Sequence, residues 1–265
     1  MNYRLAMLDI DGTLQHRGRW NPGALELVDL LHARGITVAL CSGRTTGSMI
    51  TLGRELRQAG FLASNSGSTV LERRGEEWVT LAHRAMSAAV FVEAIGRARE
   101  VGLEVWVHTE REWLVAEKSE LVDQEESFVG DVSTLDRSTD RDDVGKLLLL
   151  AHDPGHRPVA RGMGELPGVT TVASSDVYVD VIPEVSASAK GGDVLVERLG
   201  LGWDEVIAIG DSENDRGMLT RAGLGIAVAP MTLEALGQPG RGQIRRSVAD
   251  TADALAALRQ ELATP

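Results

Sequence analysis

Short apolar runs alternate with longer amphipathic segments in the N-terminal part of the chain. The run at residues 5–8 is followed by a segment whose leucines recur at helical spacing, and then by a second apolar run at residues 36–40. Asn21 and Pro22 suit the N-cap and first position of a helix, and Gly35 suits the residue after its end. The pattern therefore predicts a strand, a helix and a parallel strand, joined by a right-handed crossover.

The same alternation continues to residue 81 and returns after residue 183. Further elements are expected as a helix at 46–59, strands at 61–63, 69–71 and 78–81, a helix at 191–199, a strand at 206–209, a helix at 216–222, a strand at 225–229 and a closing helix at 248–262, with a loose loop at 238–242. Alternating strands and helices predict a Rossmann-like, doubly wound α/β sheet.

Between these two parts the pattern changes to strand pairs interleaved with helices. We expect helices at 87–101, 119–129 and 157–163, and strands at 103–108, 113–116, 146–151, 169–174 and 177–182. Such an order predicts an open sheet covered on one face. The segment from 81 to 183 holds ten basic against nineteen acidic residues, whereas the remainder holds 17 against 20. We therefore predict a discontinuous core of residues 1–81 and 184–265 and an inserted α+β domain of residues 82–183.

Composition excludes several classes of protein. The net charge of −12 argues against a nucleic-acid partner, because binding to nucleic acid requires Lys and Arg to neutralise phosphates. No apolar stretch approaches the roughly 18 residues of a membrane helix, and the N-terminal residues show no signal-peptide pattern. A single cysteine, Cys41, excludes an internal disulfide and a multi-cysteine metal site. We expect a cytoplasmic protein with neither a nucleic-acid nor a membrane partner, of unknown oligomeric state.

The first apolar run ends in Asp9-Ile10-Asp11-Gly12-Thr13. Residues i and i+2 of a strand lie on the same side, so the carboxylates of Asp9 and Asp11 can point to one place. Two such charges repel by roughly 4 kcal/mol at 4 Å and an effective dielectric near 20. The segment is either a simple turn, since Asp and Gly favour turns, or a site in which a proton or a cation relieves the repulsion.

Three other predicted strands also end in polar residues, and parallel strands bring their carboxyl ends to one edge. These further residues are Ser42 and Gly43, Asn65 and Ser66, and Asp211 and Asp215. Four carboxylates gathered with a phosphate would require a cation. The all-oxygen set of ligands, with no His or Cys beside it, favours Mg²⁺.

This constellation resembles the haloacid dehalogenase superfamily of phosphatases, and within it the Cof-type branch, subfamily IIB, with a C2B cap. Four segments match its motifs in order: residues 9–13, residues 42–44, residues 190–191, and residues 210–215 followed by Met218-Leu219. The resemblance covers essentially the whole chain, including a cap placed between the second and third motifs. The segment after the third strand, Asn65-Ser66-Gly67-Ser68, departs from the Cof-type pattern Asn-Gly-Ala. When Gly67 is aligned with the glycine of that pattern, Ser66 stands where the pattern has asparagine.

The resemblance implies a role for each matching residue. Asp9 would be the nucleophile that forms an aspartyl-phosphate, and Asp11 would be the general acid and base. Mg²⁺ would be held by Asp9, by Asp211 and by the backbone carbonyl of Asp11. Asp215 would be either a further ligand or a partner of the ligands. The phosphate and substrate would be bound by Gly12, Thr13, Ser42, Gly43, Asn65, Ser66, Lys190 and Asn214, with Ser42 and Lys190 also counted as catalytic. Arg44 binds substrate or pairs with a carboxylate.

The expected activity is a Mg²⁺-dependent phosphomonoesterase acting on a small metabolite. The acidic cap disfavours polyanionic leaving groups, which points to sugar or polyol phosphates. In the cap, the candidate specificity residues are His108, Arg111, Lys118 and Tyr178. Two alternatives stay open: a phosphosugar mutase of the same fold, and a non-enzymatic regulator that stores phosphate on Asp9. Cys41 is no phosphatase cysteine, since no arginine stands six positions on, and no Gly-Lys phosphate loop or dinucleotide fingerprint occurs.

Overall fold

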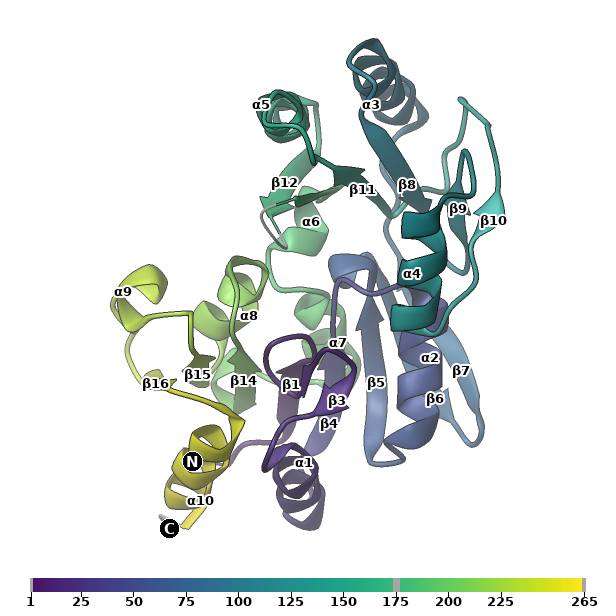
Figure 1. Ribbon diagram of the computed structural model, residues 1–265. Helices are drawn as coiled ribbons and strands as arrows, with labels where there is room; N and C mark the ends of the chain where they lie inside the picture. Colours follow the sequence, from purple (N-terminus) through teal and green to yellow (C-terminus); the bar gives the residue numbers. More distant parts are fainter. Residues whose placement is uncertain (1, 174–176, 264–265) are drawn as a thin grey trace.

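The computed structural model describes residues 2–173 and 177–263, so Ser174, the expected end of one strand, lies outside the described residues. The larger sheet of the described chain has eight strands in the order β16-β15-β14-β1-β4-β5-β6-β7 (Figure 1). From β16 to β5 neighbouring strands are parallel, and β6 and β7 extend the sheet antiparallel. The bounds are β1 Leu5–Asp9, β4 Thr37–Cys41, β5 Ala59–Ser64, β6 Thr69–Arg74, β7 Glu77–His83, β14 Val206–Gly210, β15 Leu224–Val228 and β16 Ile244–Val248.

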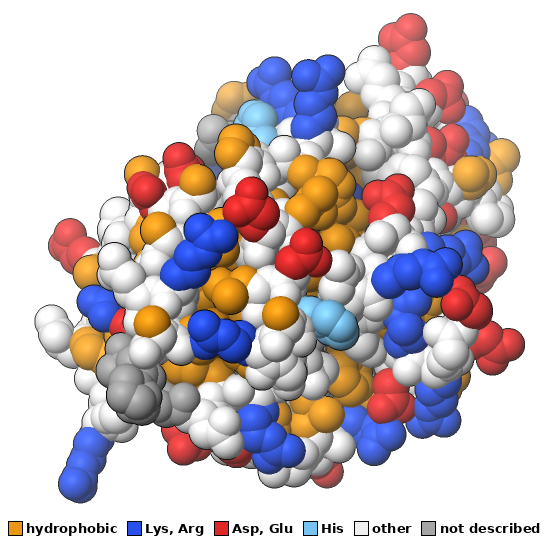
Figure 2. Space-filling view, turned by 90° about the horizontal axis from the view of Figure 1, so that it is seen from below, with side chains coloured by type: hydrophobic (Ala, Val, Ile, Leu, Met, Phe, Trp, Pro, Cys, Tyr) orange, Lys and Arg blue, Asp and Glu red, His pale blue; other side chains and the backbone are white. Residues whose placement is uncertain are grey.

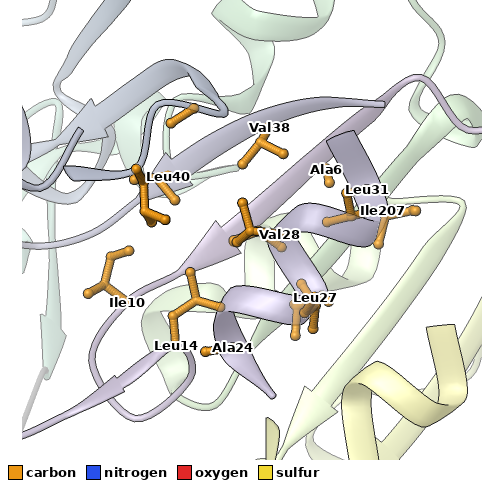
Figure 3. Close-up of a cluster of buried hydrophobic side chains, with 14 of the residues drawn as sticks. Ala6, Ile10, Leu14, Ala24, Leu27, Val28, Leu31, Val38, Leu40 and Ile207 are labelled. Carbon is orange, nitrogen blue, oxygen red and sulfur yellow. The ribbon is translucent and has the colours of Figure 1, made fainter. Parts of the chain in front are cut away.

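Helices cover both faces of this sheet. One face packs on α1 (Ala24–Ala33), α2 (Thr46–Glu55) and α10 (Thr251–Ala263), and the other on α7 (Gly192–Leu199), α8 (Arg216–Arg221) and α9 (Leu233–Leu236). Side chains of β1 alternate between the two faces of the sheet. Ala6 and Leu8 belong to the apolar cluster on the first face, and Leu5 and Met7 belong to the cluster on the second. Figure 3 shows the first cluster, with Leu27, Val28 and Leu31 of α1 beside the strands. The doubly wound α/β prediction is confirmed.

A second sheet of the described residues has six strands in the order β10-β9-β8-β11-β13-β12. Its elements are α3 Ala88–Glu100, β8 Glu104–His108, β9 Trp113–Val115, α4 Glu120–Val129, β10 Thr134–Leu135, β11 Lys146–Leu150, α5 His156–Gly162, β12 Val169–Ala173 and β13 Tyr178–Pro183, followed by the short α6 Glu184–Ala187. Helices α3 and α5 pack on one face, and α4 packs on part of the other, so the expectation of a sheet covered on one face only was wrong in part. Figure 1 shows this second part above the core, with α4 lying between the two.

The predicted limits of the inserted domain fall close to the change of sheet. Strand β7 of the large sheet continues to His83, two residues past the predicted boundary at 81, and β13 of the second sheet ends at Pro183. We propose that the chain divides near these two crossings, and we call residues 82–183 the cap domain.

Three expectations about the core were wrong in detail. The helix expected at 46–59 ends at Glu55, and β5 begins at Ala59. Helix α1 begins at Ala24, not Pro22, because Gly23 takes the N-cap position with a left-handed φ of 81°. The Asn21 side chain instead donates to the backbone oxygen of Thr13, 2.8 Å away. The closing helix begins at Thr251, because residues 244–248 form β16, an edge strand that was not predicted.

A short two-stranded ribbon directly follows the first motif. It consists of β2 (Gln15–His16) and β3 (Arg19–Trp20). Among the described helices, none is both long and apolar enough to cross a bilayer. Figure 2 views the molecule from the core end and shows acidic, basic and apolar side chains scattered over this face, not gathered by type.

Candidate active site

The ends of four adjacent parallel strands, β14, β1, β4 and β5, form one edge of the core, as the sequence predicts. Beyond this edge lies a cavity of about 240 Å³, closed on the other side by the cap domain. Its walls include Asp9, Asp11, Ser42 and Asp211 from the core, and His108 and Tyr178 from the cap domain. Both parts of the chain therefore contribute to one site.

Asp9 is the last residue of β1, and its side chain is almost fully buried. Its Oδ1 accepts a hydrogen bond of 2.7 Å from Lys190 Nζ, whereas Oδ2 is buried and has no hydrogen-bond partner among the described residues. Burial, followed by the charge of Asp215, raises the pKa of Asp9 well above its usual range. One carboxylate oxygen is thus held by the protein, and the other is left for a ligand.

Lys190 is fully buried and contacts three carbonyl or carboxylate groups. Its Nζ lies 2.7 Å from Asp9 Oδ1, 2.5 Å from Asp215 Oδ1 and 3.1 Å from Asn214 Oδ1. Burial opposes its charge, but the carboxylates of Asp215 and Asp9 outweigh burial and raise its pKa. The backbone of Lys190 has a left-handed φ of 52°, and a Cβ placed on Gly67 would lie 2.3 Å from its carbonyl carbon. A close backbone packing therefore positions this ammonium.

Asp211 and Asp215 follow β14 and have different surroundings. Asp211 Oδ1 accepts from Thr13 Oγ1 at 3.0 Å, and burial, followed by the charge of Asp215, raises the pKa of Asp211 to about 6. Asp215 Oδ2 accepts from the amides of Asp211 and Ser212, each at 3.1 Å, while its Oδ1 contacts Lys190. Both oxygens of Asp215 are thus already used by the protein.

Gly12 allows the first motif to approach Asp211. Its φ is +92°, a conformation that side chains with a Cβ rarely adopt, and a Cβ there would lie 2.1 Å from Asp211 Oδ2. The turn residue predicted from Asp-Gly thus has a second requirement, which is space for the carboxylate of another strand.

Asp11 pairs with Arg44. The guanidinium of Arg44 donates from Nε to Asp11 Oδ2 at 2.8 Å and from Nη2 to Asp11 Oδ1 at 2.6 Å, and Nη2 also contacts Gln15 at 3.1 Å. Of the two interpretations of Arg44, the structure shows the carboxylate pair. The Asp11 side chain is 44% exposed and already lines the cavity, so it is accessible to a substrate there.

Ser42 and Gly43 follow β4 and form part of the cavity wall. Ser42 Oγ accepts from the amide of Arg44 at 3.2 Å, and the backbone oxygen of Gly43 accepts from Lys146 Nζ of the cap domain at 2.7 Å. The Lys146 ammonium is buried and also lies 3.4 Å from Asp180 Oδ1. Neither Lys146 nor Asp180 was predicted from the sequence as a site residue.

Asn65 and Ser66, which follow β5, connect the core to the cap domain. Both have left-handed φ values, 52° and 57°. Asn65 Nδ2 donates to the backbone oxygen of Thr109 at 2.9 Å, and Ser66 Oγ donates to Asp180 Oδ2 at 2.7 Å. At this departure from the Cof-type pattern, both side chains therefore contact the cap domain.

The carboxylates fit a magnesium ion. One oxygen from each of Asp9, Asp211 and Asp215 lies within 4.8 Å of the others. Asp9 Oδ2 has no hydrogen-bond partner among the described residues, and the raised pKa values of Asp9 and Asp211 mark carboxylates whose charged form a cation would stabilise. An all-oxygen set of this kind suits Mg²⁺.

The four cap candidates have different positions. His108 and Tyr178 line the cavity, but Arg111 and Lys118 are not among its lining residues. Arg111 Nη2 donates to Thr80 Oγ1 of the core at 2.8 Å, and Lys118 pairs with Glu126. Arg111 thus joins the cap domain to the core, and Lys118 stabilises the cap domain itself.

Several lining residues had little or no signal in the sequence. They are Trp106, Trp113, Glu125, Phe128, Lys146 and Asp180. Two signals were present: Lys146 is one of only three lysines in the chain, and Asp180 is a charged residue inside an apolar strand.

Comparison with known proteins agrees with this geometry. The family of haloacid dehalogenase-like hydrolases matches residues 6–235. A phosphoglycolate phosphatase of Methanospirillum hungatei is 27% identical over 230 residues, which is 85% of this chain and 84% of that protein. A haloacid dehalogenase-like hydrolase of Bacteroides thetaiotaomicron has a similar structure, with a TM-score of 0.78, 23% identity, and coverage of 97% of this chain and 100% of that one.

A sugar phosphatase of HAD subclass IIB has the same fold, with a TM-score of 0.78 and 17% identity over 97% of this chain and 98% of that one. The family match spans most of the chain and includes all four predicted motifs. The chain therefore belongs to the haloacid dehalogenase-like hydrolases and is a phosphatase of that superfamily.

Proposed function

We propose that the protein is a Mg²⁺-dependent phosphomonoesterase that acts on a small phosphorylated metabolite through an aspartyl-phosphate on Asp9. The observation that carries this proposal is the state of the Asp9 carboxylate. Lys190 holds Oδ1, and Oδ2 is buried without a partner among the described residues at the wall of the cavity. A carboxylate with one fixed and one free oxygen is suited to attack a phosphorus atom.

The magnesium ion would be held by Asp9, Asp211 and the backbone carbonyl of Asp11. When bound, it supplies positive charge that lets the carboxylate and the phosphate approach each other. Asp215 uses both of its oxygens in the protein, so we assign it the task of positioning Lys190 and the 211–212 backbone. Of the two possibilities that the sequence leaves open for Asp215, we thus propose that it is a partner of the ligands.

The reaction would proceed in two displacements. In the first, an oxygen of the Asp9 carboxylate forms a bond to phosphorus, the bond from phosphorus to the leaving oxygen breaks, and Asp11 gives its proton to that oxygen. In the second, Asp11 takes a proton from water, and the water oxygen displaces the Asp9 carboxylate to release inorganic phosphate. One oxygen of Asp11 would leave Arg44 for the leaving oxygen while the other keeps the pair with Arg44, and the exposed position of Asp11 allows this movement.

The remaining groups of the core would bind the transferring phosphoryl group. Lys190 stays beside Asp9 in its charged form and balances the charge that develops on the phosphoryl oxygens. The Ser42 hydroxyl and the Gly43 amide lie at the end of the neighbouring strand β4, where they are placed to donate to the same oxygens. Thr13 fixes Asp211 through its hydroxyl.

The test is phosphate release from a broad panel of phosphomonoesters with Mg²⁺, using the full chain. We expect release that EDTA abolishes and that Asp9→Asn lowers to background. Asp29→Asn, a change at an exposed carboxylate of α1, is the matched control and should keep full activity. Absence of release from every substrate, with Asp9→Asn and the unaltered protein indistinguishable, would overturn the proposal.

The substrate class is part of the proposal. Relatives that share about a quarter of the sequence are named phosphoglycolate phosphatases, and a protein of the same fold is named a sugar phosphatase. The cavity lies between core and cap domain and is small, which suits a leaving group of metabolite size. We propose a sugar or polyol phosphate, in agreement with the acidic cap domain.

A further inference from the structure

Aromatic rings of the cap domain form a continuous wall of the cavity. The ring centroids of Trp106 and Trp113 are 5.1 Å apart, those of Trp106 and Tyr178 are 6.4 Å apart, and those of His108 and Trp113 are 6.4 Å apart. All four residues line the cavity. Such a wall favours a leaving group that has an apolar face.

The hydrogen bonds of Asn65 determine which nitrogen of His108 carries the proton. Asn65 Nδ2 donates to the backbone oxygen of Thr109, so Asn65 Oδ1 is the acceptor that faces His108 Nδ1 at 3.1 Å. Nδ1 must therefore carry the hydrogen. Burial, together with the charge of Lys146, lowers the pKa of His108 well below its usual range, so the ring is neutral.

The second nitrogen of this ring is left as an acceptor. In a neutral imidazole with its hydrogen on Nδ1, Nε2 carries a lone pair. This atom is buried, and within residues 2–173 and 177–263 it has no hydrogen-bond partner. A buried polar atom without a partner is costly, so a ligand that supplies a donor would gain from binding here.

The charged residues of the cavity wall oppose an anionic leaving group. Arg44 is paired with Asp11, and Lys146 with Asp180 and the oxygen of Gly43. Among the described lining residues, no cation is thus left over for a carboxylate. Glu125 adds a further acidic group to the same wall.

We propose that His108 Nε2 accepts a hydrogen bond from a hydroxyl group of an uncharged leaving group, whose apolar face lies on the aromatic wall. This inference rests on the proposed phosphomonoesterase function and deepens it, because it names the feature that the cap domain recognises. It also predicts that 2-phosphoglycolate, whose leaving group carries a carboxylate, is a poor substrate, unlike what the names of the relatives suggest.

The experiment compares kcat/KM for four substrates with Mg²⁺. Glucose 6-phosphate carries hydroxyls on an aliphatic ring, and pyridoxine 5′-phosphate carries one on an aromatic ring. The better of the two shows which type of ring carries the hydroxyl that His108 binds. 2-Phosphoglycolate carries a carboxylate, and p-nitrophenyl phosphate has an aromatic ring without a donor. We expect the better hydroxylated substrate to exceed 2-phosphoglycolate at least about tenfold.

His108→Phe keeps a ring but removes the acceptor. We expect it to lower kcat/KM for the better hydroxylated substrate roughly 5- to 20-fold and to leave p-nitrophenyl phosphate within about twofold. His156→Phe, on α5 and outside the cavity lining, is the matched control and should change neither value. If His108→Phe does not fold, the ranking of the four substrates by the unaltered protein still tests the proposal.

The outcomes separate this inference from the function on which it rests. Preference for 2-phosphoglycolate, or an equal loss on all substrates in His108→Phe, would overturn the role of His108 while hydrolysis itself stands. Failure to hydrolyse any substrate, p-nitrophenyl phosphate included, would overturn both.

Discussion

Replacing Lys190 by methionine tests the charge balance of the site. The change keeps most of the side-chain volume but removes the ammonium that lies 2.7 Å from Asp9 and 2.5 Å from Asp215. Both carboxylates are buried and would lose their positively charged partner. We therefore expect Lys190→Met to lower the free energy of unfolding as well as the activity.

The structure sets the size of this loss. At these distances and an effective dielectric near 20, each carboxylate attracts the ammonium by about 6 kcal/mol. Burial of the ammonium costs several kcal/mol in return, so the net loss is expected to be about 3–5 kcal/mol, as for other buried ion pairs that lose one member. The loss should be smaller at pH 5 than at pH 8, because a carboxyl with a raised pKa, such as Asp9, can take up a proton instead.

Thermal unfolding in EDTA, followed by circular dichroism, measures this effect. A chain of this size is expected to lose roughly 2–4 °C per kcal/mol, so Lys190→Met should melt about 6–20 °C below the unaltered protein. Lys118→Met is the matched control, because Lys118 is partly exposed and its pair with Glu126 is worth at most about 1 kcal/mol. Melting of Lys190→Met within about 2 °C of the unaltered protein would refute the reasoning.

Three further changes test other parts of the site. Gly12→Ala should reduce Mg²⁺-dependent phosphate release more than about tenfold, because the new Cβ would meet Asp211. Gly18→Ala, also at positive φ but with no atom of the described residues within 4 Å, should stay near full activity, and equal effects of the two changes would contradict this. In EDTA, the stability that Asp211 contributes should be present below about pH 4 and lost as the pH rises through about 6. Urea midpoints measured over this pH range should therefore fall for the unaltered protein, and this part of the fall should be absent in Asp211→Asn. Asp180→Asn leaves the Lys146 ammonium without its carboxylate, so the rate on 2-phosphoglycolate relative to p-nitrophenyl phosphate should rise several-fold; an unchanged ratio would count against the assignment of charges in the cavity.

The parts of the site that belong to one sheet edge were predictable from the sequence. Strand alternation and parallel topology placed Asp9, Ser42, Asn65 and Asp211 at the ends of four strands, and the structure brings these strand ends together. Local rules were sufficient here because the carboxyl ends of parallel strands lie at the same edge of a sheet, so residues that follow those strands lie close together.

Contacts between the core and the cap domain were not predictable in this way. The pair of Lys146 with Asp180, and their contacts with Gly43 and Ser66, depend on how the second sheet lies against the first. The turn of Asp11 toward Arg44 likewise depends on side-chain geometry that no spacing rule encodes.

Some core elements were missed for a different reason. Strand β16 has the sequence Ile-Arg-Arg-Ser-Val, whose two arginines hide the apolar pattern of an edge strand that is only half buried. The start of α1 moved to Ala24 because Asn21 is used to hold the first motif, a tertiary contact that overrides the local preference for an N-cap.

The left-handed turn at Asn65 and Ser66 has a consequence for engineering. Asn65 orients the imidazole of His108, and Ser66 binds Asp180, so two core residues set the chemistry of the cap domain. A chimera that receives residues 82–183 alone would carry the cap's side chains without the amide and hydroxyl that orient them. To transfer substrate preference between relatives, residues 65–66 and residues 82–183 would therefore have to be exchanged together, although they are separate segments of the chain.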